Sequence, residues 1–418
     1  MNSNSSNRID ARDLSAADGL LLLITRALDR LKPGEVLEIA SKNPSAPHDL
    51  PAWCRLQSHR WLGTESHNGG WLHRLEKGSV LRVLTNRELD WGNRAPIKDG
   101  RFDTRDWLLG HAAHIEETAK RSDGFSPRGA TVEQESPEFL FDVLQRNEGW
   151  SEGAAEFYEQ ATAGHWDGSR DIPWGQLQAL DEDLERAICQ LMTFLAENEY
   201  SALYVPAKWI ARIHPHFTET VLFLATQVRD EARHIEVFVK RALANGGGLQ
   251  FSSASTQASL KTLLDQEDFV QASFMLSVLG EGTFLDLLRY VETHAPDPVT
   301  REIARRTRID ETRHVHFALD HIGAVLRAEP SIKENLYRAT ANRASVLSGM
   351  KGLNPLVEES LVILAAGGLS PERLPFGTKA RLDLYDTMNE NRIRRLTTIG
   401  FADHEAEELS RLHTPNFM

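Results

Sequence analysis

Apolar residues recur at helical spacing through most of the chain after Trp174. They return every three or four positions, which predicts amphipathic helices with one buried face. Proline and glycine residues stand at most of the breaks between these segments. The predicted helices cover residues 177–206, 217–245, 256–293, 297–326, 331–350, 354–366, 379–396 and 402–412. We therefore predict a mainly α protein built around a helical bundle.

The start of the chain has a different pattern, in which short helices and short strands alternate. Residues 19–31 are apolar at helical spacing and end at a Lys-Pro-Gly turn. A second short helix is predicted from Asp49 onwards. Strands are predicted over residues 36–40, 71–75 and 79–84. Together these elements predict a small α+β domain over residues 9–84.

Between these two parts the periodicity weakens. The intervening segment is rich in Gly, Asp, Arg and Ser, and only two short helices are predicted in it, over 105–120 and 137–145. We expect an irregular connector that packs on the bundle. A chain of 418 residues suits two or three such units. The predicted parts are the α+β domain (9–84), the connector (85–171) and the bundle with extra C-terminal helices (172–418).

Composition narrows the class of protein. The formal net charge of −13 argues against nucleic acid or an anionic membrane as a main partner. No apolar run approaches the ~20 residues of a membrane-spanning helix, and residues 1–15 lack the pattern of a secretion signal. Cys54 and Cys189 lie far apart and suggest no disulfide framework. We expect a cytoplasmic protein, with the oligomeric state left open, a homodimer included.

One five-residue pattern occurs twice. Residues 230–234 and 310–314 both read Asp-Glu-x-Arg-His, and four fixed positions recur by chance in roughly one of 10⁵ windows. Glu and His three positions apart lie on one face of a helix, so both can bind the same metal ion. Carboxylates with neutral imidazoles suit Fe(II), Mn(II) or Zn(II), and carboxylate-rich sites favour the harder metals. The predicted ligands from these motifs are Glu231, His234, Glu311 and His314.

A complete two-metal site needs one further carboxylate from each of two other helices. Before the second motif, Glu281 is the only Glu in the apolar stretch 269–288. A carboxylate there is costly to bury unless it is paired or bound to metal. We predict Glu281 as a ligand, and the alternative is a core Glu paired with Arg289 or Arg308.

Before the first motif, helical phase chooses between two candidates. Glu199 falls on the apolar stripe that includes Leu195 and Ala202, whereas Glu197 falls beside Thr193 on another face. We therefore predict Glu199 as the ligand and keep Glu197 as the alternative.

Glycines flank Glu281 in the sequence. Gly280 and Gly282 each lower helix propensity by about 1 kcal/mol relative to Ala, which indicates a close backbone approach or space for a substrate. The nearby apolar residues Phe274, Val278 and Leu285 are predicted to form the pocket that keeps water from the site.

The Asp that precedes each motif Glu is predicted to orient a histidine. Ligand histidines usually donate their second ring N–H to a carboxylate, which fixes the tautomer. We expect Asp230 to serve His314 and Asp310 to serve His234, across the bundle. The arginine of each motif is expected to neutralise these acids at the rim of the site.

These motifs resemble the ferritin-like di-iron carboxylate superfamily over residues 175–330. The superfamily includes bacterial multicomponent monooxygenase hydroxylases, ribonucleotide reductase small subunits and p-aminobenzoate N-oxygenase. Glu199 followed by Tyr200 looks like the hydroxylases' first-helix ligand segment, and the repeated motif looks like their paired ligand motifs. The resemblance implies a ferritin-like bundle with two Fe ions, Mn/Fe left open, that activates O₂ with electrons from an external donor.

Two departures narrow this resemblance. Phe238 stands where ribonucleotide reductase small subunits place a radical Tyr, and Phe has no phenolic O–H to lose. Thr307 stands where the N-oxygenase family adds a third His. A site of four carboxylates and two histidines remains.

The first domain resembles the TusA-like (SirA-like) sulfur carriers. The matching segments are residues 10–14, 31–35, 43–44 and 49–54. The reactive Cys of that family stands in a Cys-Pro pair two residues after the Leu of the opening segment, and here that place is Ala16-Ala17. We interpret the domain as a degenerate carrier kept for docking or assembly, with a thiol role for Cys54 as the alternative.

The predicted function is an O₂-dependent di-iron oxidoreductase. It would oxidise a small organic molecule by hydroxylation, N-oxygenation or desaturation. The alternatives are a protein that detoxifies iron, O₂ or peroxide without an organic substrate, and a non-catalytic metal-bound scaffold linked to sulfur transfer.

Overall fold

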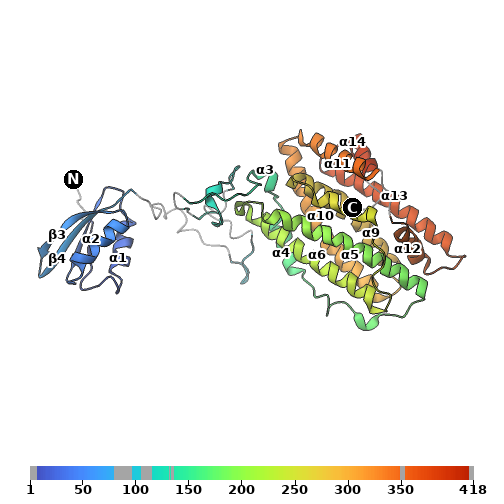
Figure 1. Ribbon diagram of the computed structural model, residues 1–418, viewed down its shortest axis with the longest axis horizontal. Helices are drawn as coiled ribbons and strands as arrows, with labels where there is room; N and C mark the ends of the chain where they lie inside the picture. Colours follow the sequence, from blue (N-terminus) through green and yellow to red (C-terminus); the bar gives the residue numbers. More distant parts are fainter. Residues whose placement is uncertain are drawn as a thin grey trace. The chain divides into compact units, whose positions relative to one another are not determined.

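The computed structural model describes residues 7–79, 97–104, 115–130, 132, 136–348 and 354–413. By its contacts the chain divides into two compact units (Figure 1). The first comprises residues 1–96, 108–114 and 129–138, and the second comprises residues 97–107, 115–128 and 139–418. The predicted strand over 79–84 and most of the predicted helix over 105–120 lie outside the described residues.

The N-terminal unit is a four-stranded sheet with two helices. The strand order is β1-β2-β4-β3, with β1 parallel to β2 and the other pairs antiparallel. The elements are β1 (Arg8–Asp10), α1 (Leu20–Leu28), β2 (Val36–Ser41), α2 (Ala46–Leu56), β3 (Arg60–His67) and β4 (Gly70–Glu76). The helix over 19–31 and the strands over 36–40 and 71–75 are confirmed in type. β1 and β3 escaped prediction because β1 is only three residues long and β3 is mostly polar and exposed.

One face of this sheet and the two helices form a small apolar core. Leu37 and Ile39 of β2 and Leu75 of β4 are fully buried, as are Leu50 and Cys54 of α2. Each such aliphatic side chain contributes about 1.5–3 kcal/mol through burial. The core therefore holds Cys54 in the interior, away from solvent.

Four long helical segments of the second unit pack into a bundle. α5 (Glu182–Ile210) lies along α6 (Thr218–Ala244), and α10 (Pro298–Ala328) lies along α9 (Gly282–His294). Further contacts between α6 and α10, and between α5 and the segment before α9, close the bundle. One continuous apolar core runs through it, and Figure 1 shows α5 and α6 side by side.

The remaining helices cover this bundle. α12 packs on α5 and α13, α13 packs on α9, and α11 packs on α14. The additional helices are α3 (Arg146–Gly149), α4 (Ala154–Ala163), α7 (Ala254–Leu264), α11 (Ile332–Ser348), α12 (Pro355–Ala366), α13 (Leu374–Thr398) and α14 (Asp403–Leu412). Among the described residues, no helix is both long and apolar enough to span a membrane.

The single helix predicted over 256–293 is wrong. α7 ends at Leu264, and Asp268 then caps a new helix, α8 (Phe269–Ser273), by accepting a hydrogen bond from the Gln271 N–H at 2.7 Å. A π-helical segment, η5 (Phe274–Glu281), joins α8 to α9. The polar run at 265–268 interrupts the periodicity, and π-helices are frequent at functional sites.

Other boundaries also differ. α5 begins at Glu182, not 177, because residues 174–176 form a 3₁₀ turn, and it continues past Pro206 to Ile210. The helix predicted over 137–145 is wrong, because this segment is extended and the Asp142 and Val143 N–H groups donate to the Arg212 carbonyl.

The buried thiols generate a prediction. Burial raises the pKa of Cys54 to about 11 and that of Cys189 to about 12. At pH 8 both should stay protonated, with a thiolate fraction at least roughly a hundredfold below that of an ordinary thiol. We expect the native protein to react very slowly with Ellman's reagent at pH 8, and both thiols to react at once in guanidinium chloride. A thiol that reacts immediately in the native protein would contradict this arrangement.

Candidate metal centre

Six ionisable side chains meet in the centre of the bundle. α5 supplies Glu199, α6 supplies Glu231 and His234, η5 supplies Glu281, and α10 supplies Glu311 and His314. All six are at most 2% exposed. The six residues singled out from the sequence are therefore brought together in space.

The six side chains form two overlapping groups of possible metal ligands. Ligand atoms of Glu199, Glu231, His234 and Glu311 lie within 4.8 Å of one another, and so do those of Glu231, Glu281, Glu311 and His314. Glu231 and Glu311 belong to both groups, whereas each remaining Glu and each His belongs to one. One Glu from each of two helices, with a Glu-x-x-His motif from each of two others, is the ligand arrangement of ferritin-like dimetal proteins. The bundle is thus ferritin-like.

Both histidines present the same ring nitrogen to the carboxylates. His234 Nδ1 lies 3.0 Å from Glu231 Oε2 and 3.3 Å from Glu311 Oε1. His314 Nδ1 lies 2.9 Å from Glu231 Oε1 and 3.4 Å from Glu311 Oε2. The two Nδ1 atoms are therefore the ring nitrogens available to metal ions.

The donor set fits a pair of cations. Removal from water without a hydrogen bond is costly for polar groups. Several buried polar atoms of the cluster, some of them in the close contacts above, have no hydrogen bond of ordinary geometry among the residues that the structure describes. They are Glu199 Oε1, Glu231 Oε1, Glu281 Oε2, both carboxylate oxygens of Glu311, and His314 Nδ1. Four carboxylates in one dry site repel one another, and two divalent ions would satisfy both the charge and the orphaned atoms.

The pKa shifts in the cluster also arise from the burial of several carboxylates close to one another. Burial, together with the charges of neighbouring carboxylates, raises the pKa of Glu199 and of Glu281 well above the usual value. Burial alone would lower the pKa of His234, but the hydrogen bond to Asp310 and the adjacent carboxylates raise it well above the usual value. Without metal ions, protons on these side chains balance the charge of the carboxylates. Metal binding must therefore release those protons.

A buried ion-pair network surrounds the two histidines. His234 Nε2 lies 3.2 Å from Asp310 Oδ2, and His314 Nε2 lies 3.4 Å from Asp230 Oδ2. This is the crosswise pairing expected from the sequence. A carboxylate on Nε2 keeps a proton there and leaves Nδ1 free for metal.

The arginines of the two motifs hold these carboxylates. Arg233 Nη2 lies 2.7 Å from Asp310 Oδ2 and also pairs with Asp230. Arg313 Nη2 lies 3.2 Å from Asp230 Oδ2 and also pairs with Asp310. Both guanidinium groups are buried, so the expectation that they lie at the rim is wrong. Their burial strengthens the pairing, because water does not screen it.

Two residues of the site escaped the sequence analysis. Trp166 donates its indole N–H to Asp310 Oδ2 at 2.7 Å, from the segment between α4 and α5. Gln227 donates to Glu281 Oε1 at 3.0 Å. Gln227 stands one turn before Glu231 on α6, so helical phase could have found it. Nothing local in the sequence points to Trp166, because its partner is 144 positions away.

The alternatives kept for two ligands lie differently. Glu197 Oε2 accepts hydrogen bonds from Ser252 and Gln257, away from the cluster. Arg308, the pairing considered for Glu281, instead donates to Glu292 at 2.8 Å. The geometry therefore favours Glu199 and a metal-facing Glu281.

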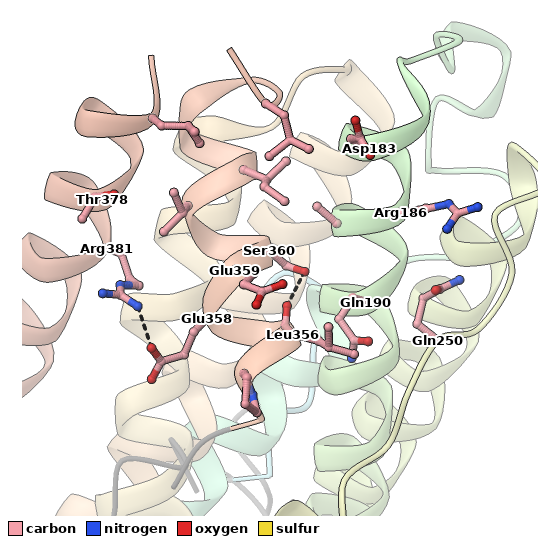
Figure 2. A pocket seen from close by; sticks show the side chains of 16 residues that line it. Asp183, Arg186, Gln190, Gln250, Leu356, Glu358, Glu359, Ser360, Thr378 and Arg381 are labelled. Carbon is pink, nitrogen blue, oxygen red and sulfur yellow. Dashed lines mark hydrogen bonds and ion pairs between the residues drawn. The ribbon is translucent and has the colours of Figure 1, made fainter. Parts of the chain in front are cut away.

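The large cleft shown in Figure 2 is a separate feature. Its volume is about 800 Å³, and it lies between α5, α12 and α13. Arg381 and Glu358 face each other across 2.6 Å on its wall. None of the six clustered residues lines it, so it is not the metal site.

Comparisons with known proteins agree with part of this picture. Residues 7–77 match the family described as Sulfurtransferase TusA. No curated protein matches the chain. The family match covers the N-terminal unit, whose reactive position in that family is Ala16-Ala17 here.

Solved structures resemble the bundle. One is R2-like ligand-binding oxidase with an aerobically reconstituted metal cofactor after photoconversion, at 18% identity and a TM-score of 0.42, covering 62% of this chain and 94% of that one. A valine-to-isoleucine mutant of the same oxidase, with an aerobically reconstituted Mn/Fe cofactor, has 19% identity and a TM-score of 0.44 over 62% and 94% of the two chains. The fold assignment rests on the helices and ligand positions described above.

Removing one carboxylate tests the metal centre. Glu281→Ala should bind about one Fe(II) per chain where the parent binds two, because only the group around His314 loses a ligand. Glu197→Ala is the matched control, since it removes a Glu of α5 that points elsewhere, and it should bind two. Metal content after anaerobic loading and desalting checks both. Equal iron in the parent and both variants would contradict the assignment.

Removing the indole N–H tests the outer network. Trp166→Phe keeps an aromatic ring but removes the donor to Asp310, so metal affinity should fall by about tenfold. Trp174→Phe is the control, because the Trp174 N–H donates only to the Gly168 carbonyl. Competition with a metal-sensitive dye would measure both affinities. An unchanged affinity in Trp166→Phe would show that the hydrogen bond does not orient the site.

Proposed function

We propose that this protein is an O₂-dependent dimetal oxidase or oxygenase that acts on a small organic substrate. The observation that carries the proposal is the buried set of four carboxylates and two Nδ1 atoms, which fits two cations. Bound there, two Fe ions, or one Mn and one Fe, would supply the redox chemistry that activates O₂. Electrons would come from an external donor, and the oxidation would be a hydroxylation, an N-oxygenation or a desaturation.

Some residues of the site would serve as fixed metal ligands, and another would serve as an adjustable one. Glu231 and Glu311 belong to both groups and would help to hold either ion. The crosswise aspartates keep the imidazoles in one tautomer. Gln227 and Ser277 hydrogen-bond to Glu281, neither of them a charged partner, and Glu281 stands at the end of a π-helix, so it is suited to change its binding mode.

Apolar side chains exclude water around the cluster. Phe223 packs edge-on to the His314 ring at 6.3 Å between centroids, and Phe238, Phe274 and Val278 are fully buried. A dry surrounding protects a strong oxidant from side reactions. Leu285, predicted to share this role, instead lines a separate pocket beside α9.

The tyrosines nearest in sequence do not favour a stored radical. Tyr200 and Tyr204 follow Glu199 on α5 but are 50% and 56% exposed, so they face solvent. The position one turn after His234 is the buried Phe238. These placements support oxidation of an external molecule over oxidation of a protein side chain.

Rapid mixing with O₂ tests the proposal. Protein loaded anaerobically with two Fe(II) per chain should consume O₂ and give a transient visible absorption band, and Glu281→Ala should give neither. Mass spectrometry of a panel of small acids, amines and thiols after one turnover should then find a product gaining one oxygen or losing two hydrogens. Absence of O₂ consumption by the loaded protein would refute the proposal. O₂ consumption with ferric deposits and no organic product would favour the detoxifying alternative.

A further inference from the structure

A second pocket lies against α10, the helix that carries Glu311 and His314. It has a volume of about 220 Å³ and lies between α9, α10 and α13. Two of its lining residues, Thr312 and Val315, immediately follow the ligands Glu311 and His314 on α10. Because successive residues of a helix point in different directions, the pocket lies on a face of α10 next to the one that carries Glu311 and His314. Its α9 wall follows Glu281 directly in the chain.

Positive charge dominates this pocket. Four arginines line it, and the acid among the lining residues is Asp286. Asn391 donates to Asp286 Oδ1 at 2.6 Å, while Asp286 Oδ2 has no hydrogen-bond partner among the described residues, so this one acid partly offsets the positive charge. One arginine, Arg308, is taken by Glu292. The other three arginines are Arg289, Arg394 and Arg395. In a chain with a net charge of −13, such a concentration of arginine is a specific local feature.

Arg395 is the best-defined of these arginines. Its Nε donates to the carbonyl of Val278 at 3.3 Å, inside the π-helical segment. The side chain passes over Gly282, where a Cβ would come within 2.4 Å of that Nε. A glycine next to Glu281 is thus explained by the close approach of this guanidinium group, and any other residue would push it away.

The same guanidinium group has an unused donor. Arg395 Nη2 is buried and has no hydrogen-bond partner among the residues that the structure describes. Burial lowers the pKa of Arg395 to about 10, since Asp286 only partly compensates the charge. A buried donor without an acceptor is destabilising, and a planar guanidinium group matches an oxyanion in charge and geometry.

We infer that the pocket between α9, α10 and α13 binds a small oxyanion, the carboxylate of an organic acid, held by Arg395 with Arg289 and Arg394. A volume of 220 Å³ equals about seven water molecules, which limits the ligand to the size of a benzoate ring with its carboxylate. A carboxylate bound at Nη2 would also hold Arg395 in place against Val278 and Gly282. Through these contacts, its binding would affect the segment that carries Glu281. Binding requires no metal, so it can be tested apart from the proposed oxidase activity.

The test is a titration of the full-length, metal-free protein with 4-fluorobenzoate, followed by ¹⁹F NMR, with inorganic phosphate titrated in parallel by calorimetry. We expect saturable binding that weakens at least tenfold in Arg395→Lys, which keeps the charge but loses the planar fork, and in Arg289→Gln. Arg289 is exposed, so its substitution leaves the fold intact. Arg186→Gln, at a 67% exposed arginine of α5, is the control and should bind like the parent.

The outcomes separate the sources of the anion. Tighter binding of fluorobenzoate than of phosphate, lost in both variants, supports an organic carboxylate. Tighter binding of phosphate, lost in the same variants, keeps the oxyanion site but overturns the organic ligand. No saturable binding of either probe, or binding that Arg289→Gln and Arg395→Lys leave unchanged, overturns the proposal.

Discussion

The mutual repulsion of buried carboxylates is the constraint on which this bundle depends. Glu199, Glu231, Glu281 and Glu311 converge from four helical segments into a space that excludes water. No sequence would retain this arrangement for packing alone, because a well-packed apolar core of the same volume is at least as stable. Cations must therefore balance the cluster, whether protons on the histidines or metal ions. The bundle is therefore a scaffold that holds four carboxylates so close together that cations must balance their charge.

The network around the histidines extends the same principle outward. Two aspartates orient the imidazoles, and two buried arginines neutralise the aspartates. Trp166 adds one more donor and covers the arginine of the first motif, whose guanidinium carbon lies 4.5 Å from its ring centroid. The aspartates thus compensate the charge of the histidines, and the arginines compensate the charge of the aspartates. The side of the site that carries the histidines is therefore rigid. The opposite side, at Glu281, has the uncharged donors Gln227 and Ser277 and a π-helix in place of this charged network.

The N-terminal unit contributes a different kind of information. It folds as the small α+β domain of the family that its residues match, but alanines occupy the reactive position. Its remaining thiol, Cys54, is fully buried with a raised pKa. A buried, protonated thiol is a poor nucleophile, so Cys54 is not placed for sulfur transfer.

The sequence by itself determined the helical class of the bundle and the six residues that meet at its candidate metal centre. Spacing within a helix is a local property, so two Glu-x-x-His motifs and the phase of Glu199 could be recognised without knowing how the helices pack. Tertiary structure alone decided the rest. The π-helix replaced a predicted continuous helix, and Arg395 reached Val278 across 117 positions. Trp166 reached Asp310 across 144. These contacts depend on which elements become neighbours, and no periodicity along the chain records that.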